Sequence, residues 1–66
     1  MYYKSLTNSE LVRKFREAED FDLTLALSAL ICERAGLAEM WARAVAAGAP
    51  ADFDCVLSLA IERLNA

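Results

Sequence analysis

Carboxylates are the side chains of this sequence whose types and spacing come closest to chemistry. One cluster consists of Glu19, Asp20 and Asp22, and a second consists of Asp52 and Asp54. Paired carboxylates can act as general acid and base, but such a site also needs a concave pocket, which a 66-residue chain is too small to enclose. Both clusters fall where a helix is expected to begin, and acidic side chains stabilise helix N-termini. We therefore interpret them as helix caps.

The two cysteines and the missing histidine argue against a catalytic or metal site. Cys32 and Cys55 have apolar neighbours, with Arg34 as the nearest cation, so we expect small buried hydrophobes rather than reactive thiols. The chain contains no histidine, which removes the commonest base for a nucleophile. Two isolated cysteines do not supply the four ligands of a zinc site. The sequence predicts a reduced protein that is not an enzyme and has no cofactor and no metal.

Four segments with the apolar spacing of helices must position these side chains, and no segment alternates as a strand does. The expected helices span approximately residues 8–19, 23–35, 38–47 and 53–64. Thr7 and Glu10 have the spacing of a capping box before the first helix. Gly36 is expected to end the second helix in the left-handed conformation, and Gly48 to Pro50 to end the third. The predicted fold class is all-α, with about four short helices in a single domain over residues 1–66.

The apolar content of the chain predicts self-association. Hydrophobic residues make up 58% of the sequence, above the roughly 45–50% of typical soluble domains. The second helix is apolar around most of its circumference and must be buried on more than one side. In so short a chain we expect a second copy to provide part of that cover, giving a homodimer. The residues expected in this shared core and dimer interface are Leu23, Leu27, Leu30 and Ile31.

Charge and hydropathy exclude further classes of function. The net charge of −3 opposes binding to a phosphate backbone. The basic residues Lys4, Arg13, Lys14 and Arg16 cluster near the N-terminus and could meet an acidic partner. The three that fall on the first expected helix have acidic neighbours one turn away, so a solvated charged face is the favoured interpretation. No uncharged run reaches the ~18 residues of a membrane helix, and the opening residues lack an apolar signal core. We expect a cytoplasmic protein that binds no membrane, and nucleic acid is not its expected partner.

Residues Ser28 to Leu37 resemble the helix-turn-helix family of DNA-binding motifs. A small residue, Gly36 and Leu37 occupy the positions that this motif requires, and Val45 falls where its second helix buries a residue. The resemblance implies a small DNA-binding regulator. The helix that would contact DNA, at residues 38–47, carries one base and one acid, whereas base edges are recognised by several donors and acceptors. A plain helical hairpin is the favoured interpretation, and contact with DNA stays open.

Aromatic residues and one methionine are the candidate anchors for a protein partner, because interfaces concentrate their energy in such side chains. The candidate partner-binding residues are Tyr2, Tyr3, Phe21, Met40 and Trp41. The spacing of Met40 and Trp41 fits an interface anchor and a core position equally well. Tyr2 and Tyr3 either pack onto the bundle or form an extended arm.

The opening segment Ser5 to Arg13, SLTNSELVR, resembles the start of several short phage- and prophage-encoded reading frames. This resemblance implies a small helical accessory protein that works by binding a host or phage protein. The predicted function is therefore a non-enzymatic protein-binding module that inhibits or modulates another protein by occupying its surface. The alternative is the small helix-turn-helix regulator of transcription.

Overall fold

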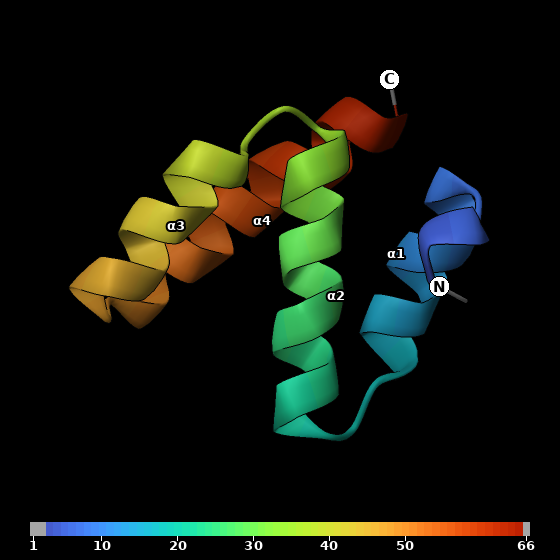
Figure 1. The fold of residues 1–66 in the computed structure, drawn as a ribbon, viewed down its shortest axis with the longest axis horizontal. Coiled ribbons are helices and arrows are strands. Elements are labelled where there is room, and N and C mark those ends of the chain that lie inside the picture. Colours follow the sequence, from blue (N-terminus) through green and yellow to red (C-terminus); the bar gives the residue numbers. More distant parts are fainter. Residues whose placement is uncertain (1–2, 66) are drawn as a thin grey trace.

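The computed structural model describes residues 3–65 of the chain. This part forms one short 3-10 helix and four α-helices, and it contains no strand. The elements are η1 (Tyr3–Ser5), α1 (Asn8–Glu17), α2 (Phe21–Arg34), α3 (Ala38–Ala47) and α4 (Pro50–Asn65). The predicted all-α fold with four short helices is thus confirmed over the described residues (Figure 1).

Helices α2 and α4 form the centre of the bundle. α2 contacts α1, α3 and α4, and α4 also contacts α1 and α3. Figure 1 shows α2 standing between α1 on one side and the α3–α4 pair on the other, with α4 crossing behind the upper end of α2. Three helices of its own chain therefore cover part of the apolar surface of α2, while Phe21 stays 72% exposed and Leu25 and Ala29 are only partly buried. The homodimer stays a prediction.

The core confirms part of the apolar stripe expected on the second helix. Leu27 and Ile31 are fully buried, whereas Leu23 and Leu30 are partly buried against the same core. Ser28 is also buried, and its hydroxyl donates to the Thr24 carbonyl at 2.7 Å, which satisfies its polar group. The buried hydrophobic residues are Leu11, Val12, Leu27, Ile31, Cys32, Leu37, Trp41, Ala44, Val56 and Ala60.

The predicted capping box begins α1. The Glu10 N–H donates to the Thr7 hydroxyl at 3.2 Å, and the Thr7 N–H donates to a Glu10 carboxylate oxygen at 2.9 Å. The second bond favours the charged carboxylate, and together with the Thr7 hydroxyl it lowers the pKa of Glu10. The helix ends at Glu17, short of the expected residue 19, because Ala18 has extended backbone with φ −67° and ψ 129°.

Helix α2 begins at Phe21, two residues before the expected start. The Asp20 carboxylate accepts a hydrogen bond from the Leu23 N–H at 2.9 Å, so Asp20 is the N-cap and Asp22 lies within the first turn. The sequence correctly predicted that an acidic residue near position 20 caps this helix, but it predicted the first helical residue two positions too late. An N-cap needs extended backbone, and Asp20 has it, with φ −85° and ψ 132°.

Gly36 ends α2 as predicted. Its φ of 77° lies in the left-handed region, where residues with a β-carbon are strained. The Leu37 N–H donates to the Cys32 carbonyl at 2.8 Å, and the Gly36 N–H donates to the Glu33 carbonyl at 3.1 Å. These two bonds form a Schellman motif, with Leu37 buried beneath the helix end.

The expected start of the fourth helix at residue 53 is wrong, because α4 begins at Pro50. Gly48 alone ends α3, with a φ of 64° and its N–H donating to the Ala44 carbonyl at 3.0 Å. Proline suits the first position of a helix because its fixed φ is helical and no N–H is needed there. The Ala49 carbonyl then accepts from the Asp52 N–H at 3.0 Å. Pro50 is therefore the first residue of α4, in addition to lying just after the end of α3.

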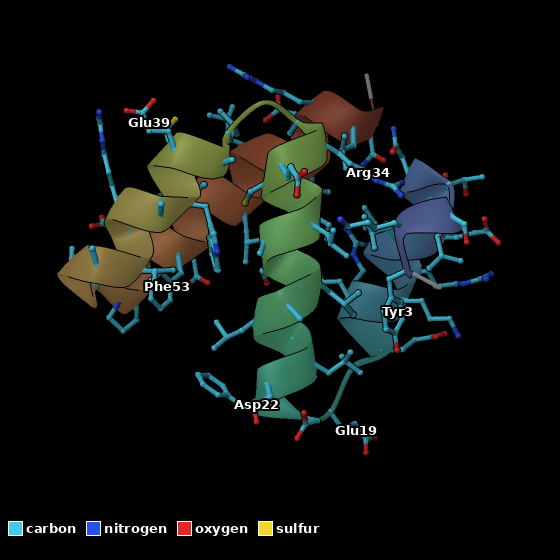
Figure 2. All side chains as sticks on the ribbon, viewed as in Figure 1. Tyr3, Glu19, Asp22, Arg34, Glu39 and Phe53 are labelled. Carbon is cyan, nitrogen blue, oxygen red and sulfur yellow. The ribbon has the colours of Figure 1, made fainter. Side chains whose placement is uncertain are left out.

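Two arginines connect elements that lie far apart in the chain. The Arg34 guanidinium donates to the carbonyl oxygens of Leu6 at 2.6 Å and Lys4 at 2.8 Å. Figure 2 shows Arg34 reaching from the end of α2 toward the N-terminal segment. Arg63 of α4 donates to the Ala35 carbonyl at 3.1 Å, at the C-terminal end of α2, where a positive charge is favourable.

Candidate functional site

An open groove of about 450 Å³ lies between α3 and α4, and we call it the α3–α4 groove. It is lined by Met40, Arg43, Ala44 and Ala47 of α3 and by Asp52, Cys55 and Val56 of α4. The short connection through Gly48 folds α4 back along α3, which places the two helices side by side (Figure 1). Ala44 and Val56 are buried and form the floor. Because the alanines carry only a methyl group, the space above them is left open.

Apolar side chains border this groove at the surface. Met40 is 43% exposed at its α3 wall, and the exposed Leu59 lies one helical turn beyond Cys55 on α4. Methionine adapts its shape to different apolar surfaces, and it is common at binding sites that accept several partners. The groove is therefore suited to receiving apolar side chains from another molecule.

The two charged side chains of the groove have opposite signs and come from opposite walls. Arg43 lies on α3, and Asp52 lies on α4. Arg43 forms a 2.7 Å ion pair with Glu39, whose side chain is 81% exposed, while that of Arg43 is 76% exposed. Such exposed pairs contribute about 0–1 kcal/mol, so exchanging Glu39 for another partner would change the energy of Arg43 little.

The two cysteines have different environments, contrary to the expectation that both are buried. Cys32 is fully buried in α2, and desolvation raises the pKa of its thiol to about 11. Cys55 is exposed and lines the α3–α4 groove. A thiol reagent should therefore modify Cys55 and leave Cys32 unmodified in the folded protein.

A second, smaller hollow of about 250 Å³ lies between α1 and the end of α4. It is lined by Ser9, Val12, Arg13, Arg16 and Asn65. Arg13 and Arg16 belong to the basic cluster that the sequence places on a solvated face, and both are exposed. With Val12 as its one apolar residue, this hollow offers less apolar surface than the α3–α4 groove.

The carboxylate clusters lie at the starts of α2 and α4. Asp20 caps α2, and Figure 2 shows Glu19 and Asp22 at the exposed start of that helix. Asp52 and Asp54 are exposed in the first part of α4. Among residues 3–65, no three side chains of cysteine or carboxylate type are grouped so that they could hold a metal ion.

The four described candidate partner-binding residues have different surroundings. Met40 lies in the α3–α4 groove, whereas Phe21 is 72% exposed at the start of α2 and does not line it. Trp41 is only 8% exposed, and its ring centroid lies 5.4 Å from that of Phe53 with a 44° tilt, so it fits the core alternative. Tyr3 is partly buried against the core within η1, which fits packing onto the bundle. Tyr2 lies outside the described residues.

The hairpin around Gly36 departs from the helix-turn-helix expectation at Val45. This residue was expected to be buried and is 49% exposed. The cause is the position of α4: it packs against the face of α3 that carries Trp41 and Ala44 and leaves Val45 on the outside.

Sequence reasoning missed most of the groove. Ala44, Ala47 and Val56 belong to ordinary apolar stripes, and nothing in their types distinguishes a groove from a core. Met40 was selected as a partner-binding residue, whereas Asp52 and Cys55 were selected only as a helix cap and a buried residue.

Among the described residues, no helix has the length and apolar character needed to cross a membrane. Comparisons of the chain with models of protein families, with curated proteins and with solved structures found no match.

Proposed function

We propose that this chain is a non-enzymatic protein-binding module whose α3–α4 groove holds apolar side chains of another protein. It acts by occupying that surface, and so inhibits or modulates its target, as the resemblance of its opening residues to phage-type accessory proteins implies. The observation that carries the proposal is the groove itself, an open apolar hollow of about 450 Å³ with Met40 at its edge.

The chemistry of the groove favours a protein over a small polar substrate. Five of its seven lining residues carry no charge, and its floor is formed by Ala44 and Val56. Helical segments bind other proteins by placing side chains from successive turns into grooves of this kind. Opposite charges at Arg43 and Asp52 would orient such a segment, because charged rim residues contribute more to register than to affinity.

The alternative of a DNA-binding regulator has less support. The exposed part of α3 consists mainly of alanines, Met40 and Val45, which offer no hydrogen-bond donors to base edges. Arg43, the base of that helix, lies in the groove and pairs with Glu39. We expect no shift of a random DNA duplex at low salt, where even non-specific binders engage. A shift would favour the DNA-binding function.

Photo-crosslinking from Cys55 tests the protein-binding function. A benzophenone maleimide attached to this exposed thiol places the reactive group at the groove, while the buried Cys32 stays unmodified. In a lysate of source cells, irradiation should yield adducts with another protein, identified by mass spectrometry. Met40→Glu should abolish these adducts because it places a charge in the apolar groove.

Val45→Glu is the matched control, since it places the same charge on an exposed apolar position of α3 outside the groove. Circular dichroism must show that both variants are folded. Adducts that persist with Met40→Glu would contradict the proposal. So would a lysate in which the labelled chain is joined only to copies of itself.

A further inference from the structure

The α3–α4 groove is complementary in charge to a second copy of itself. Its positive residue, Arg43, is on the α3 wall, and its negative residue, Asp52, is on the α4 wall. A two-fold axis lying along the groove would place α3 of each copy over α4 of the other. In such an interface each contact occurs twice, so Arg43 of each copy would meet the partner's Asp52. Two favourable pairs would form at once, and no like charges of the groove would face one another.

The same arrangement matches the apolar surfaces. Met40 and Ala47 on one wall would lie over the partner's Cys55 and Leu59, all of which are exposed in the single chain. Arg43 would exchange its exposed pair with Glu39 for a pair at the edge of an apolar contact. The attraction between two opposite charges is stronger at the edge of an apolar contact than in bulk water, because the effective dielectric constant is lower there.

We propose that a second copy of this chain occupies the α3–α4 groove, forming a two-fold homodimer through α3 and α4. The inference rests on the proposed function in one respect, that the groove is a protein-binding surface. In the dimer, the partner copy covers the groove that a target would use. Dilution or a competing target would dissociate the dimer and expose the groove.

The area available makes this a weak dimer. Each chain exposes 4389 Å² in total, and a stable interface of standard size would take about 800 Å² of it. The proposed interface takes in only parts of α3, of 10 residues, and α4, of 16 residues, so we infer an area below that size. We therefore expect a dissociation constant in about the micromolar range, with monomers and dimers exchanging at working concentrations.

Charge reversal with sedimentation equilibrium tests the pairing. The wild-type mass should rise from 7.3 kDa toward twice that value as the concentration increases. Arg43→Asp or Asp52→Arg alone should weaken dimerisation about tenfold or more, since each places two like-charge pairs in the interface. The double variant should restore dimerisation, and so should an equimolar mixture of the two single variants.

Two control variants reverse equivalent charges elsewhere. Arg16→Asp on α1 and Asp54→Arg on α4 change the net charge by the same amounts at exposed positions that do not line the groove. Neither should alter dimerisation. The reactivity of Cys55 with a chromogenic disulfide reagent gives a second readout and should fall as the concentration of wild-type protein increases.

A wild-type chain that stays at 7.3 kDa throughout, or a double variant that fails to recover, would overturn the homodimer. Either result leaves the proposed function intact if Cys55 still captures another protein in a manner that depends on Met40. Conversely, a charge-dependent dimer that captures no other protein would support the dimer and contradict the proposed function.

Discussion

The guanidinium of Arg34, at the end of α2, donates a 2.6 Å hydrogen bond to the carbonyl of Leu6, which lies just before α1. The same side chain donates to the Lys4 carbonyl at 2.8 Å and to the Asn8 side chain at 3.2 Å. One partly buried cation thus satisfies acceptors along the whole segment that leads into α1. Arginine suits this position because its planar fork directs several N–H groups at once.

Arg34→Lys should therefore destabilise the protein although it keeps the charge. An ammonium group cannot reach these acceptors simultaneously, and we expect a loss of about 1–2 kcal/mol in the free energy of unfolding. Urea denaturation followed by circular dichroism measures this loss. Arg43→Lys on the exposed surface is the control and should change stability by less than about 0.5 kcal/mol. Equal stability of the two variants would mean that the contacts of Arg34 contribute nothing.

Trp41→Ala should unfold a large fraction of the protein rather than produce a folded variant with weak binding. Trp41 is buried and packs against Phe53, and removing such a side chain costs about 3–5 kcal/mol. That loss is comparable to the total of ~3–5 kcal/mol that a core of this size supplies. Met40→Ala on the groove edge should cost about 1 kcal/mol or less. Thermal melts of the two variants would contradict this assignment if their midpoints were equally lowered.

Thr7→Ala should lower stability by about 1 kcal/mol, because it removes the hydroxyl that accepts the Glu10 N–H at the start of α1. Thr24→Ala provides a comparison, since its hydroxyl bonds the Asp20 carbonyl within a helix and caps no helix end. A chemical denaturation midpoint unchanged by Thr7→Ala would show that the capping box does not stabilise α1.

Lowering the pH should weaken the capping box of α1, because Glu10 becomes protonated. The pKa of Glu10 is lowered from 4.5 in the folded chain, so its contribution to stability is fully present above that value. This contribution is lost as the pH falls below 4.5 and through the folded pKa, because the protonated carboxyl is a poorer acceptor. Glu10→Gln should show a flatter dependence of stability on pH in this range. Parallel curves for the two proteins would contradict the assignment.

Alkali should destabilise the protein through Cys32. Burial raises the pKa of its thiol from 9.0 to about 11, so the unfolded chain loses this proton first as the pH rises. Stability is fully retained below pH 9 and falls between pH 9 and 11, by at most about 3 kcal/mol. Cys32→Ala lacks the titrating group and should lose less stability over that interval. The difference between the two curves therefore reports on Cys32.

The sequence by itself determined the features that depend on neighbours within a few residues. Helix periodicity predicted the four helices, the spacing of Thr7 and Glu10 predicted the capping box, and Gly36 was placed in its left-handed turn. These features follow from local hydrogen bonds and backbone sterics, which act over one or two helical turns. The misplaced starts of α2 and α4 have the same origin, because cap residues such as Asp20 and Pro50 are compatible with more than one boundary.

Only the tertiary structure decided which apolar side chains are buried and which form a surface. Trp41 and Met40 are adjacent and equally apolar, yet one packs on Phe53 and the other borders the groove. The direction from which α4 approaches α3 makes this difference, and that direction depends on packing among residues distant in the chain. The contacts of Arg34 with the segment before α1 are equally non-local. Burial and long-range hydrogen bonding depend on how the helices pack together, so they cannot be predicted from the apolar periodicity of a single helix.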